Sequence, residues 1–254
     1  MVYKSLTNKL GSARPRAILF DLFDTLLLIK TGVDFNEKCL LNVHKFLRDN
    51  GINLSLGDFM RMYFEVRKQL YERINKTLEE PHFSVRISEM LTRLGYDYDA
   101  STPIARGAAE AYSEEFVHFV YPDEETVPVL RSLRDGGYKI GVVSNFAIPE
   151  CVHKLLDIHG LKDLLDVVVI SAEVNKRKPS PEIFALALDA LGVEASLSFF
   201  VGDTPDVDIR GARKAGMKTV LIERRSACII NPDDEPDFKI KSLGELLVIL
   251  NNYS

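Results

Sequence analysis

The sequence has few cysteines, no excess of basic side chains and no long apolar run, and each absence excludes a class of protein. Its three cysteines, Cys39, Cys151 and Cys228, lie far apart without a CxxC spacing. We therefore expect reduced thiols in a cytoplasmic protein, not a disulfide framework. The 32 basic and 37 acidic side chains give a formal net charge of −5, which provides no electrostatic footprint for nucleic acid. No apolar run approaches the roughly 18 residues of a membrane span.

The composition is that of an ordinary globular protein. The chain has 254 residues, of which 46% are hydrophobic and 27% charged, so it can bury a core without disulfide or metal staples. The first twenty residues contain basic but no acidic side chains. Two interpretations of this segment remain open, a transit peptide and a flexible leader ahead of the first strand.

Short, nearly continuous apolar runs predict strands that are covered on both faces, as in a parallel sheet. Helical patterns lie between them, and one of these starts with Ser180 and Pro181 and stops at Gly192, which are typical start and stop residues. This alternation predicts an α/β protein with a Rossmann-like, doubly wound parallel sheet. The five expected strands are residues 17–20, 139–144, 167–171, 198–202 and 219–223.

Residues 31–120 contain no convincing strand. Within residues 58–78, apolar side chains recur at steps of three and four, which indicates an amphipathic helix. Similar patterns cover 84–96, and 35–49 and 102–119 are also expected to be helical. We therefore predict an all-helical domain at 31–120, inserted into an α/β domain made of 1–30 and 121–254.

Polar side chains follow four of the expected strands, where ligands bind in open parallel sheets. Carboxylate oxygens suit Mg²⁺, a carboxylate can act as a nucleophile that forms an aspartyl-phosphate, and a lysine supplies positive charge to phosphate oxygens. In strand order these residues are Asp21 and Thr25, Ser144 and Asn145, Lys178, and Asp203 and Asp208.

The ordered set D-x-x-x-T, hydrophobic-S-N, K-P-x-P-x-x-F and G-D-x-x-x-x-D resembles the motifs of the haloacid dehalogenase (HAD) superfamily. It is similar to the branch with a helical type 1 cap inserted between the first and second motifs. The likeness covers residues 16–223 and the closing PDFKIKSLGELL segment. Each motif alone is weak, but four in order after predicted strands are specific.

The resemblance implies a catalytic role for the loop after the first strand. Asp21 would be the nucleophile, with one oxygen attacking and the other on the metal. The backbone carbonyl of Phe23 would be a further metal ligand, and Thr25 would form a hydrogen bond within the loop.

The other three motifs would complete the site. Ser144 and the amide of Asn145 would hold phosphate oxygens, and Lys178 would neutralise the nucleophile and the transferring group. Asp203 would bind Mg²⁺, and Asp208 would bind it or orient a water ligand. The expected substrate is a small phosphorylated molecule, with no nucleic acid or membrane partner, and the protein would be a monomer or a homodimer.

Phe23 departs from the family pattern, because phosphatases of this superfamily usually carry a second aspartate at this position. That aspartate protonates the leaving oxygen, and general acid–base catalysis contributes about 10²–10⁴-fold. Asp24 is the nearest replacement, but its side chain should point away from the site, so we expect a turn role for it.

Three interpretations of Phe23 are open. The first is a 2-haloacid dehalogenase-like hydrolase, although such enzymes work without metal and lack the acidic pair that this chain keeps in GDTPDVD. The second, which we favour, is a Mg²⁺-dependent phosphatase-like hydrolase that is slow on alkyl esters. The third is a weakly active or inactive relative that binds a ligand or a protein partner.

The helical cap would exclude water and select the substrate. Its candidates to face the site are Tyr63, Arg61, Arg67 and Arg86, although long basic side chains more often lie on solvated or helix-packing surfaces. Arg177, beside Lys178, is expected to be a solvated loop charge.

Overall fold

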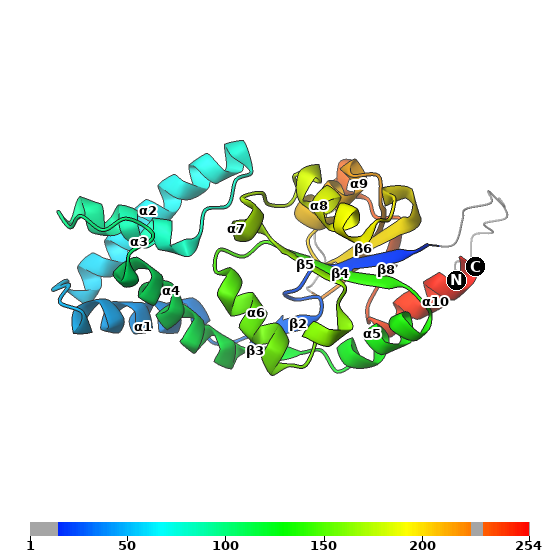
Figure 1. Cartoon of the computed structure of the whole chain (residues 1–254), viewed down its shortest axis with the longest axis horizontal. Helices are drawn as coiled ribbons and strands as arrows, with labels where there is room; N and C mark the ends of the chain where they lie inside the picture. The colour runs from blue at the N-terminus through cyan, green and yellow to red at the C-terminus, as the bar shows by residue number, and fades with distance from the viewer. Residues whose placement is uncertain (1–14, 225–230, 254) are drawn as a thin grey trace.

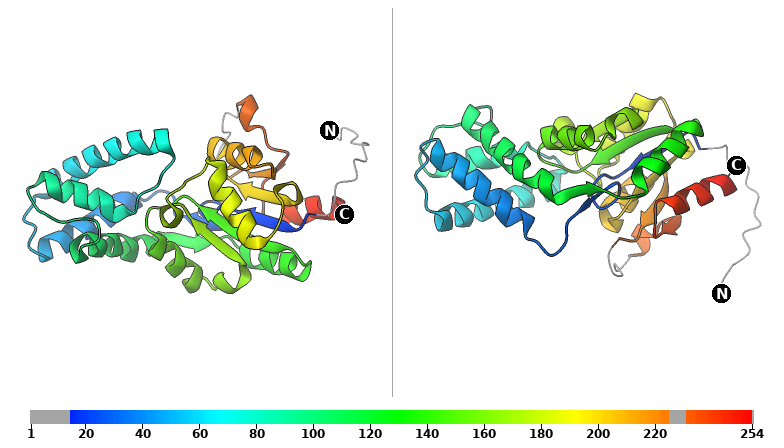
Figure 2. Two further views of the ribbon diagram at one scale, coloured as in Figure 1. Left: turned by 45° about the horizontal axis from the view of Figure 1, so that its top comes forward. Right: turned by 90° about the horizontal axis from the view of Figure 1, so that it is seen from below.

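The structure is a computed structural model that describes residues 15–224 and 231–253. Most of the basic N-terminal segment and Cys228 therefore lie outside the described residues, whereas Cys39 and Cys151 are buried free thiols. The described chain forms an α/β part and a helical part that lies beyond one end of the sheet (Figures 1 and 2). Within these residues no helix is long and apolar enough to cross a membrane.

The α/β part is built on a six-stranded parallel sheet with the order β5-β4-β1-β6-β7-β8. The sheet confirms the predicted fold class and all five predicted strands. The sixth strand, β8, was not predicted, because it has three residues at the sheet edge and its middle residue, Lys239, is exposed. The strands are β1 (Ala17–Phe20), β4 (Lys139–Ser144), β5 (Val167–Ile170), β6 (Ser198–Gly202), β7 (Lys218–Ile222) and β8 (Phe238–Ile240).

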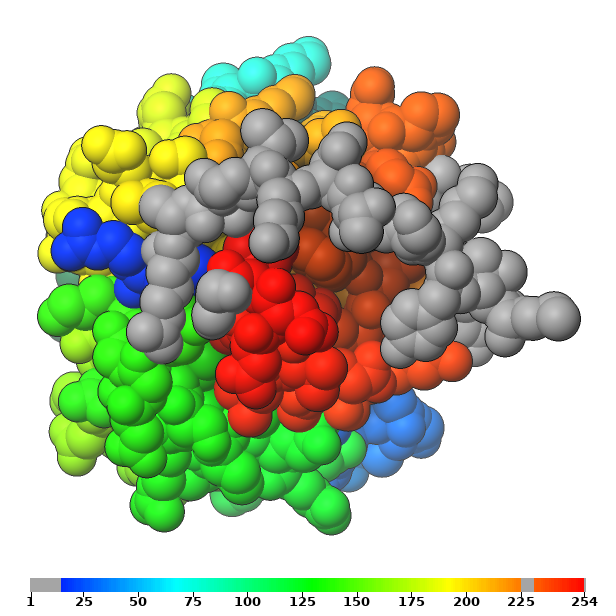
Figure 3. All heavy atoms as spheres, turned by 90° about the vertical axis from the view of Figure 1, so that its right-hand side faces the viewer, coloured from blue at the N-terminus to red at the C-terminus, as the bar shows by residue number. Residues whose placement is uncertain are grey.

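Helices cover both faces of this sheet (Figure 1). Alternate residues of a strand point to opposite faces, so Ile18 and Phe20 belong to one apolar cluster and Leu19 to another. The strands are thus covered by buried apolar side chains on both faces, which explains the continuous apolar runs in the sequence. The first face carries α5 (Thr126–Asp135), α6 (Pro149–Ile158) and α10 (Gly244–Asn252), and the second carries α8 (Pro181–Leu191) and α9 (Arg210–Lys214). Figure 3 shows α10 beside α5 at the end of the molecule away from the helical part.

The ends of α8 follow the predicted signals. The hydroxyl of Ser180 accepts a hydrogen bond from the backbone N–H of Glu182, and Pro181 occupies the first turn. Gly192 ends the helix with a φ of 63°, a left-handed conformation that favours glycine. This helix begins three residues after Lys178, so its start fixes the loop that carries the lysine.

The helical part is inserted between β1 and β4. In α2, the predicted apolar stripe is buried, from Phe59 and Tyr63 to Ile74. Two short antiparallel strands connect this part to the sheet, and these strands were not predicted. The proposed boundary after residue 30 lies next to β2, and the proposed boundary between residues 120 and 121 lies within β3. The helices are α1 (Phe35–Asp49), α2 (Leu56–Thr77), α3 (Phe83–Arg93) and α4 (Pro103–Phe116), and the connecting strands are β2 (Leu27–Ile29) and β3 (Val120–Pro122).

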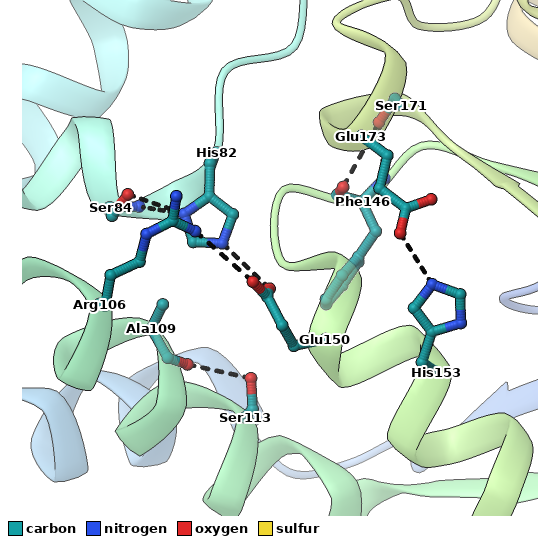
Figure 4. Close-up of polar contacts among 10 residues, drawn as sticks. All are labelled: His82, Ser84, Arg106, Ala109, Ser113, Phe146, Glu150, His153, Ser171 and Glu173. Atoms are coloured by element: carbon teal, nitrogen blue, oxygen red, sulfur yellow. Dashed lines mark hydrogen bonds and ion pairs between the residues drawn. The ribbon is translucent and has the colours of Figure 1, made fainter. Parts of the chain in front are cut away.

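The loop between α2 and α3 docks the helical part onto the α/β part. The backbone N–H of Phe83 donates to the carbonyl of Ala147 at 2.8 Å, and that of Arg177 donates to the carbonyl of Leu78 at 2.9 Å. Figure 4 shows a polar contact beside them, in which the Glu150 carboxylate of α6 meets His82 at 3.1 Å and Arg106 at 3.5 Å. The helical part is therefore closed over the carboxyl ends of the strands.

The packing of α8 on the sheet can be tested by mutation. Phe184 is fully buried, and its ring meets that of Phe200 edge-on with centroids 4.9 Å apart. Phe184→Ala should lower the free energy of unfolding by about 3–5 kcal/mol, because it leaves a cavity. Urea denaturation measures this change.

Leu186 lies on the same helix but is 43% exposed, so Leu186→Ala is the matched control. This control should stay within about 1 kcal/mol of the parent. Equal losses in the two variants would contradict the described packing of α8.

Candidate active site

The candidate site lies where β1, β4 and β6 end. β1 is the first strand in the chain and lies between β4 and β6, so the chain continues to opposite sides of it. This is a topological switch point, where open α/β sheets bind ligands. Asp21 directly follows β1, and its backbone N–H donates to the carbonyl of Val201 at 2.8 Å, which extends the ladder by one residue. Ser144 ends β4, and Asp203 directly follows β6.

A buried ionic cluster occupies this position. The ammonium of Lys178 lies 2.5 Å from a carboxylate oxygen of Asp21 and 2.8 Å from one of Asp208. Lys178 is 2% exposed, Asp21 8% and Asp208 1%. A charge at such depth is tolerated only when it is paired, so the structure brings the predicted nucleophile and the predicted lysine into direct contact.

Three carboxylates at this site form a set that suits a divalent cation. Asp21, Asp203 and Asp208 each offer one oxygen, and these oxygens lie within 4.8 Å of one another. In an octahedral Mg²⁺ site, with bonds of about 2.0–2.1 Å, opposite ligands are about 4 Å apart. Carboxylate oxygens this close together can become ligands of one ion through small side-chain movements. Hard oxygen donors of this kind fit Mg²⁺.

The turn after β6 brings Asp208 back toward the strand end. Residues Pro205–Ile209 form one turn of π-helix, a rare element that is frequent at functional sites. The backbone N–H of Thr204 donates to Asp208 at 3.0 Å. A side chain at Gly202 would collide with Asp208, because an added Cβ would lie 2.5–2.7 Å from atoms of that side chain. Gly202 and Thr204 were not among the predicted site residues. The position of Gly202 directly before Asp203, within the G-D-x-x-x-x-D motif, was the signal that could have identified it.

The predicted phosphate residues lie beside this cluster. The buried hydroxyl of Ser144 has no hydrogen-bond partner within the described chain. A buried hydroxyl without a partner is costly, and a phosphate oxygen would satisfy it. The side-chain amide of Asn145 accepts from the Lys178 backbone N–H at 2.8 Å and donates to its carbonyl at 2.9 Å. That side chain therefore positions the lysine.

Thr25 differs from its expectation. Its buried hydroxyl forms no hydrogen bond with the described residues, so the expected bond within the nucleophile loop is absent here. Its backbone carbonyl accepts from the guanidinium of Arg224 at 3.0 Å, and this guanidinium also pairs with Asp123 at 2.8 Å. Arg224 anchors the loop from a distant part of the chain, and no local motif signals this role.

The side chain of Phe23 belongs to an aromatic cluster between the two parts of the molecule. Its ring centroid is 4.9 Å from that of Phe146, in the loop after β4, and 5.7 Å from that of Phe116, on α4. Asp24 has a φ of 54°, and its carboxylate accepts from the backbone N–H of Ile29 at 3.3 Å. The turn role expected for Asp24 is therefore confirmed.

Burial and crowding of negative charge govern the ionisation of the site. Burial raises the pKa of Asp21, and the Asp208 and Asp203 carboxylates raise it further. Lys178 lowers it, and the result is about 7. Burial lowers the pKa of Lys178, but Asp208 and Asp21 more than offset this, so its pKa is above the usual value. The lysine is thus charged, and one positive charge does not balance the three carboxylates.

A cavity of about 300 Å³ lies between the helical part and the loops after β4 and before α8, and its lining includes Arg177, which precedes Lys178. Three of the four cap candidates, Tyr63, Arg67 and Arg86, line it, whereas Arg61 is exposed and pairs with Asp58. We expected Arg177 to be a solvated charge in a loop, and this prediction was wrong. Its side chain is 18% exposed, lines the cavity and pairs with an acidic residue of the helical part, Glu80.

Comparison with known proteins agrees with this architecture. The profile of the haloacid dehalogenase-like hydrolases matches residues 15–216. The glyceraldehyde 3-phosphate phosphatase of Methanopyrus kandleri is 31% identical over 244 residues, which cover 92% of this chain and 97% of that protein. The chain therefore belongs to the haloacid dehalogenase-like hydrolases, and its helical insertion between β1 and β4 has the position of a type 1 cap.

Solved structures show the same fold. A 2-haloacid dehalogenase from Pseudomonas syringae pv. Tomato has a TM-score of 0.70 at 23% identity, covering 94% of this chain and all of that chain. The magnesium-bound HAD-hydrolase YfnB from Bacillus subtilis has a TM-score of 0.61 at 23% identity, with coverage of 94% and 100%. At this level of identity the likeness establishes the fold alone.

The close approach at Gly202 gives a test of the carboxylate set. Gly202→Ala should push Asp208 away from the other two carboxylates and weaken Mg²⁺ binding by about tenfold or more, as second-shell changes typically do. The measurement is Mg²⁺ titration by calorimetry, with the melting temperature recorded alongside. Gly57→Ala is the matched control, because an added Cβ there meets no atom within 4 Å. Unchanged Mg²⁺ affinity in a folded Gly202→Ala protein would contradict this geometry.

Proposed function

We propose that this protein is a Mg²⁺-dependent hydrolase that removes phosphate from a small phosphorylated metabolite through an aspartyl-phosphate on Asp21. The observation that carries the proposal is the cluster itself. It combines three carboxylates within reach of one ion, a buried lysine, and a buried serine hydroxyl that has no partner among the described residues. The name of the M. kandleri relative, a glyceraldehyde 3-phosphate phosphatase, supports this substrate class.

Each residue then has a defined task. One oxygen of the Asp21 carboxylate attacks phosphorus, and the bond between phosphorus and the leaving-group oxygen breaks, so the dephosphorylated product leaves. Water then hydrolyses the aspartyl-phosphate, which releases inorganic phosphate and restores Asp21. The ammonium of Lys178 offsets the negative charge of the nucleophile and of the transferring group. The hydroxyl of Ser144 donates to a phosphate oxygen. Asp203 and Asp208, with Asp21 and the Phe23 carbonyl, would hold Mg²⁺, which when bound neutralises phosphate charge. Metal binding also requires Asp21 to be ionised, and its raised pKa of about 7 places this change near neutral pH.

The site contains no acid at the position of Phe23, and this restricts the leaving group. The ring of Phe23 packs on Phe116 and Phe146, and Asp24 is engaged in the turn. Neither side chain can protonate a leaving oxygen. We therefore propose that acyl or aryl phosphates, whose leaving groups need no proton, react faster than alkyl phosphates. The retained carboxylate set argues against metal-independent dehalogenase chemistry.

The surroundings of the site are consistent with a small substrate in a cytoplasmic protein. The cavity beside the cluster has a volume of about 300 Å³, at the lower end of the usual range of about 300–1,000 Å³ for small-molecule pockets. The two described cysteines are free thiols, which fits a reducing compartment.

Phosphate and halide release, measured side by side, test the reaction class. With Mg²⁺, the protein should release phosphate from acetyl phosphate and p-nitrophenyl phosphate, and EDTA should abolish this release. Asp21→Asn should lower turnover by about a thousandfold or more, because it removes the nucleophile. Chloride release from 2-chloropropionate should stay at background. Halide release that persists in EDTA would reject the phosphatase assignment.

A matched pair of variants tests the role of Phe23. Phe23→Asp restores a proton donor, and Phe23→Asn has nearly the same size without one, so both lose the same aromatic packing. Turnover of an alkyl phosphate such as glycerol 3-phosphate should be about tenfold or more higher for the aspartate variant than for the asparagine variant. Equal turnover in two folded, Mg²⁺-binding variants would show that Phe23 does not limit the reaction.

A further inference from the structure

The cavity beside the ionic cluster contains more positive than negative charge. Its charged lining residues are three arginines and two acids. Glu80 is 4% exposed and pairs with Arg177 at 3.3 Å, so these two charges offset one another. Asp34 is exposed, and its carboxylate accepts from the backbone N–H of Glu37 at the start of α1. Arg67 and Arg86 form no ion pair with any described carboxylate, which leaves two guanidinium groups unbalanced at close range.

Arg86 is the more constrained of these two residues. It is 8% exposed, its Nη1 donates to the hydroxyl of Tyr63 at 2.7 Å, and its Nε has no partner among the described residues. Its guanidinium carbon lies 5.3–5.8 Å from the ring centres of Tyr63, Phe83 and Tyr71. These rings attract the cation. The Glu80 carboxylate also attracts it, but Glu80 already pairs with Arg177, so one carboxylate is shared by two guanidinium groups. The unpartnered, buried Nε of Arg86 therefore favours an incoming anion.

The cavity is lined by residues that are direct neighbours in the chain of the proposed phosphate-site residues. Arg177 precedes Lys178 in the chain, and Asn145, which follows Ser144, lines the cavity while its side chain holds the Lys178 backbone. Consecutive Cα atoms are about 3.8 Å apart. A small molecule with its phosphate on Ser144 and Lys178 would therefore extend its other end into this cavity.

We propose that the cavity binds a second anionic group of the substrate, a carboxylate, with Arg86 as its main counter-charge. The inference rests on the proposed function, because the phosphate of the same molecule occupies the Ser144 and Lys178 site. The planar donors of a guanidinium match a carboxylate, and Nε is the donor that Tyr63 leaves free. The substrate class is a short phosphorylated molecule that also carries a carboxylate, rather than its aldehyde or alcohol counterpart.

Two non-hydrolysable ligands of equal size test this assignment. 3-Phosphonopropionate carries the phosphonate and the carboxylate, and 3-phosphonopropionamide replaces the carboxylate with an uncharged amide. Both are measured as competitive inhibitors of p-nitrophenyl phosphate hydrolysis in the presence of Mg²⁺. The parent protein should bind the acid about tenfold to a hundredfold more tightly than the amide, as expected for one charge-assisted contact.

Arg86→Met should remove this preference, so that this variant binds the acid and the amide with nearly equal affinity. Arg61→Met is the matched control, because Arg61 lies on the exposed side of α2, and it should keep the parent preference. A parent protein that binds acid and amide equally would overturn the assignment, and so would an Arg86→Met protein that retains the full preference. A purely structural role for Arg86 would weaken both ligands equally.

Two further measurements keep the test decisive. If Arg86→Met does not melt cooperatively, Arg86→Lys keeps the charge without the planar fork, and its acid-to-amide ratio should fall at least threefold. An unchanged ratio would contradict the proposal. If the parent hydrolyses no phosphate ester, the proposed function fails, and calorimetric titration of both ligands still decides the inference. Preferential binding of the acid would support the carboxylate site, and equal binding would reject it.

Discussion

The site depends on one ammonium group held between two carboxylates. Lys178 contacts Asp21 and Asp208 in a water-excluded position, with Asp203 close by. Negative charges this close repel strongly in a low dielectric, and a buried ion pair adds little net stability because desolvation opposes the attraction. The positive charge of Lys178 therefore reduces the repulsion between the carboxylates and allows them to lie this close together. The pKa of Asp21 is still raised to about 7. The cluster therefore has an excess of negative charge, which a divalent ion would neutralise.

The residues that hold this cluster in place are spread along the chain. Asn145 holds both polar backbone groups of Lys178, although the two residues are 33 positions apart. The missing side chain at Gly202 gives Asp208 its place. The ring of Phe23 contacts Phe116 of the helical part and Phe146 of the loop after β4. Loss of an acid at this position thus coincides with a gain of packing between the two parts.

Much of the fold was predictable because its signals are local. Continuous apolar runs mark strands buried on both faces, and the stripe from Phe59 to Ile74 marks α2. The members of the ionic cluster were predictable because each follows a strand. The remaining features depend on contacts between distant segments. Arg177 looks like a loop charge until Glu80, almost a hundred residues earlier, is brought against it. Strands β2 and β3 are only three residues long, and they are strands only because they pair with each other. Such short segments have no recognisable pattern in the sequence.

That pairing has a consequence for how the helical part relates to the sheet. The chain leaves through β2 and returns through β3, and the two strands are hydrogen-bonded side by side. The two ends of the four-helix insertion therefore lie next to each other, as the two ends of a tight turn do. A segment attached in this way can be lengthened, shortened or exchanged without moving β1 or β4, because its two ends always meet at the same point. The helical part can then vary while the ionic cluster at the ends of the strands stays in place.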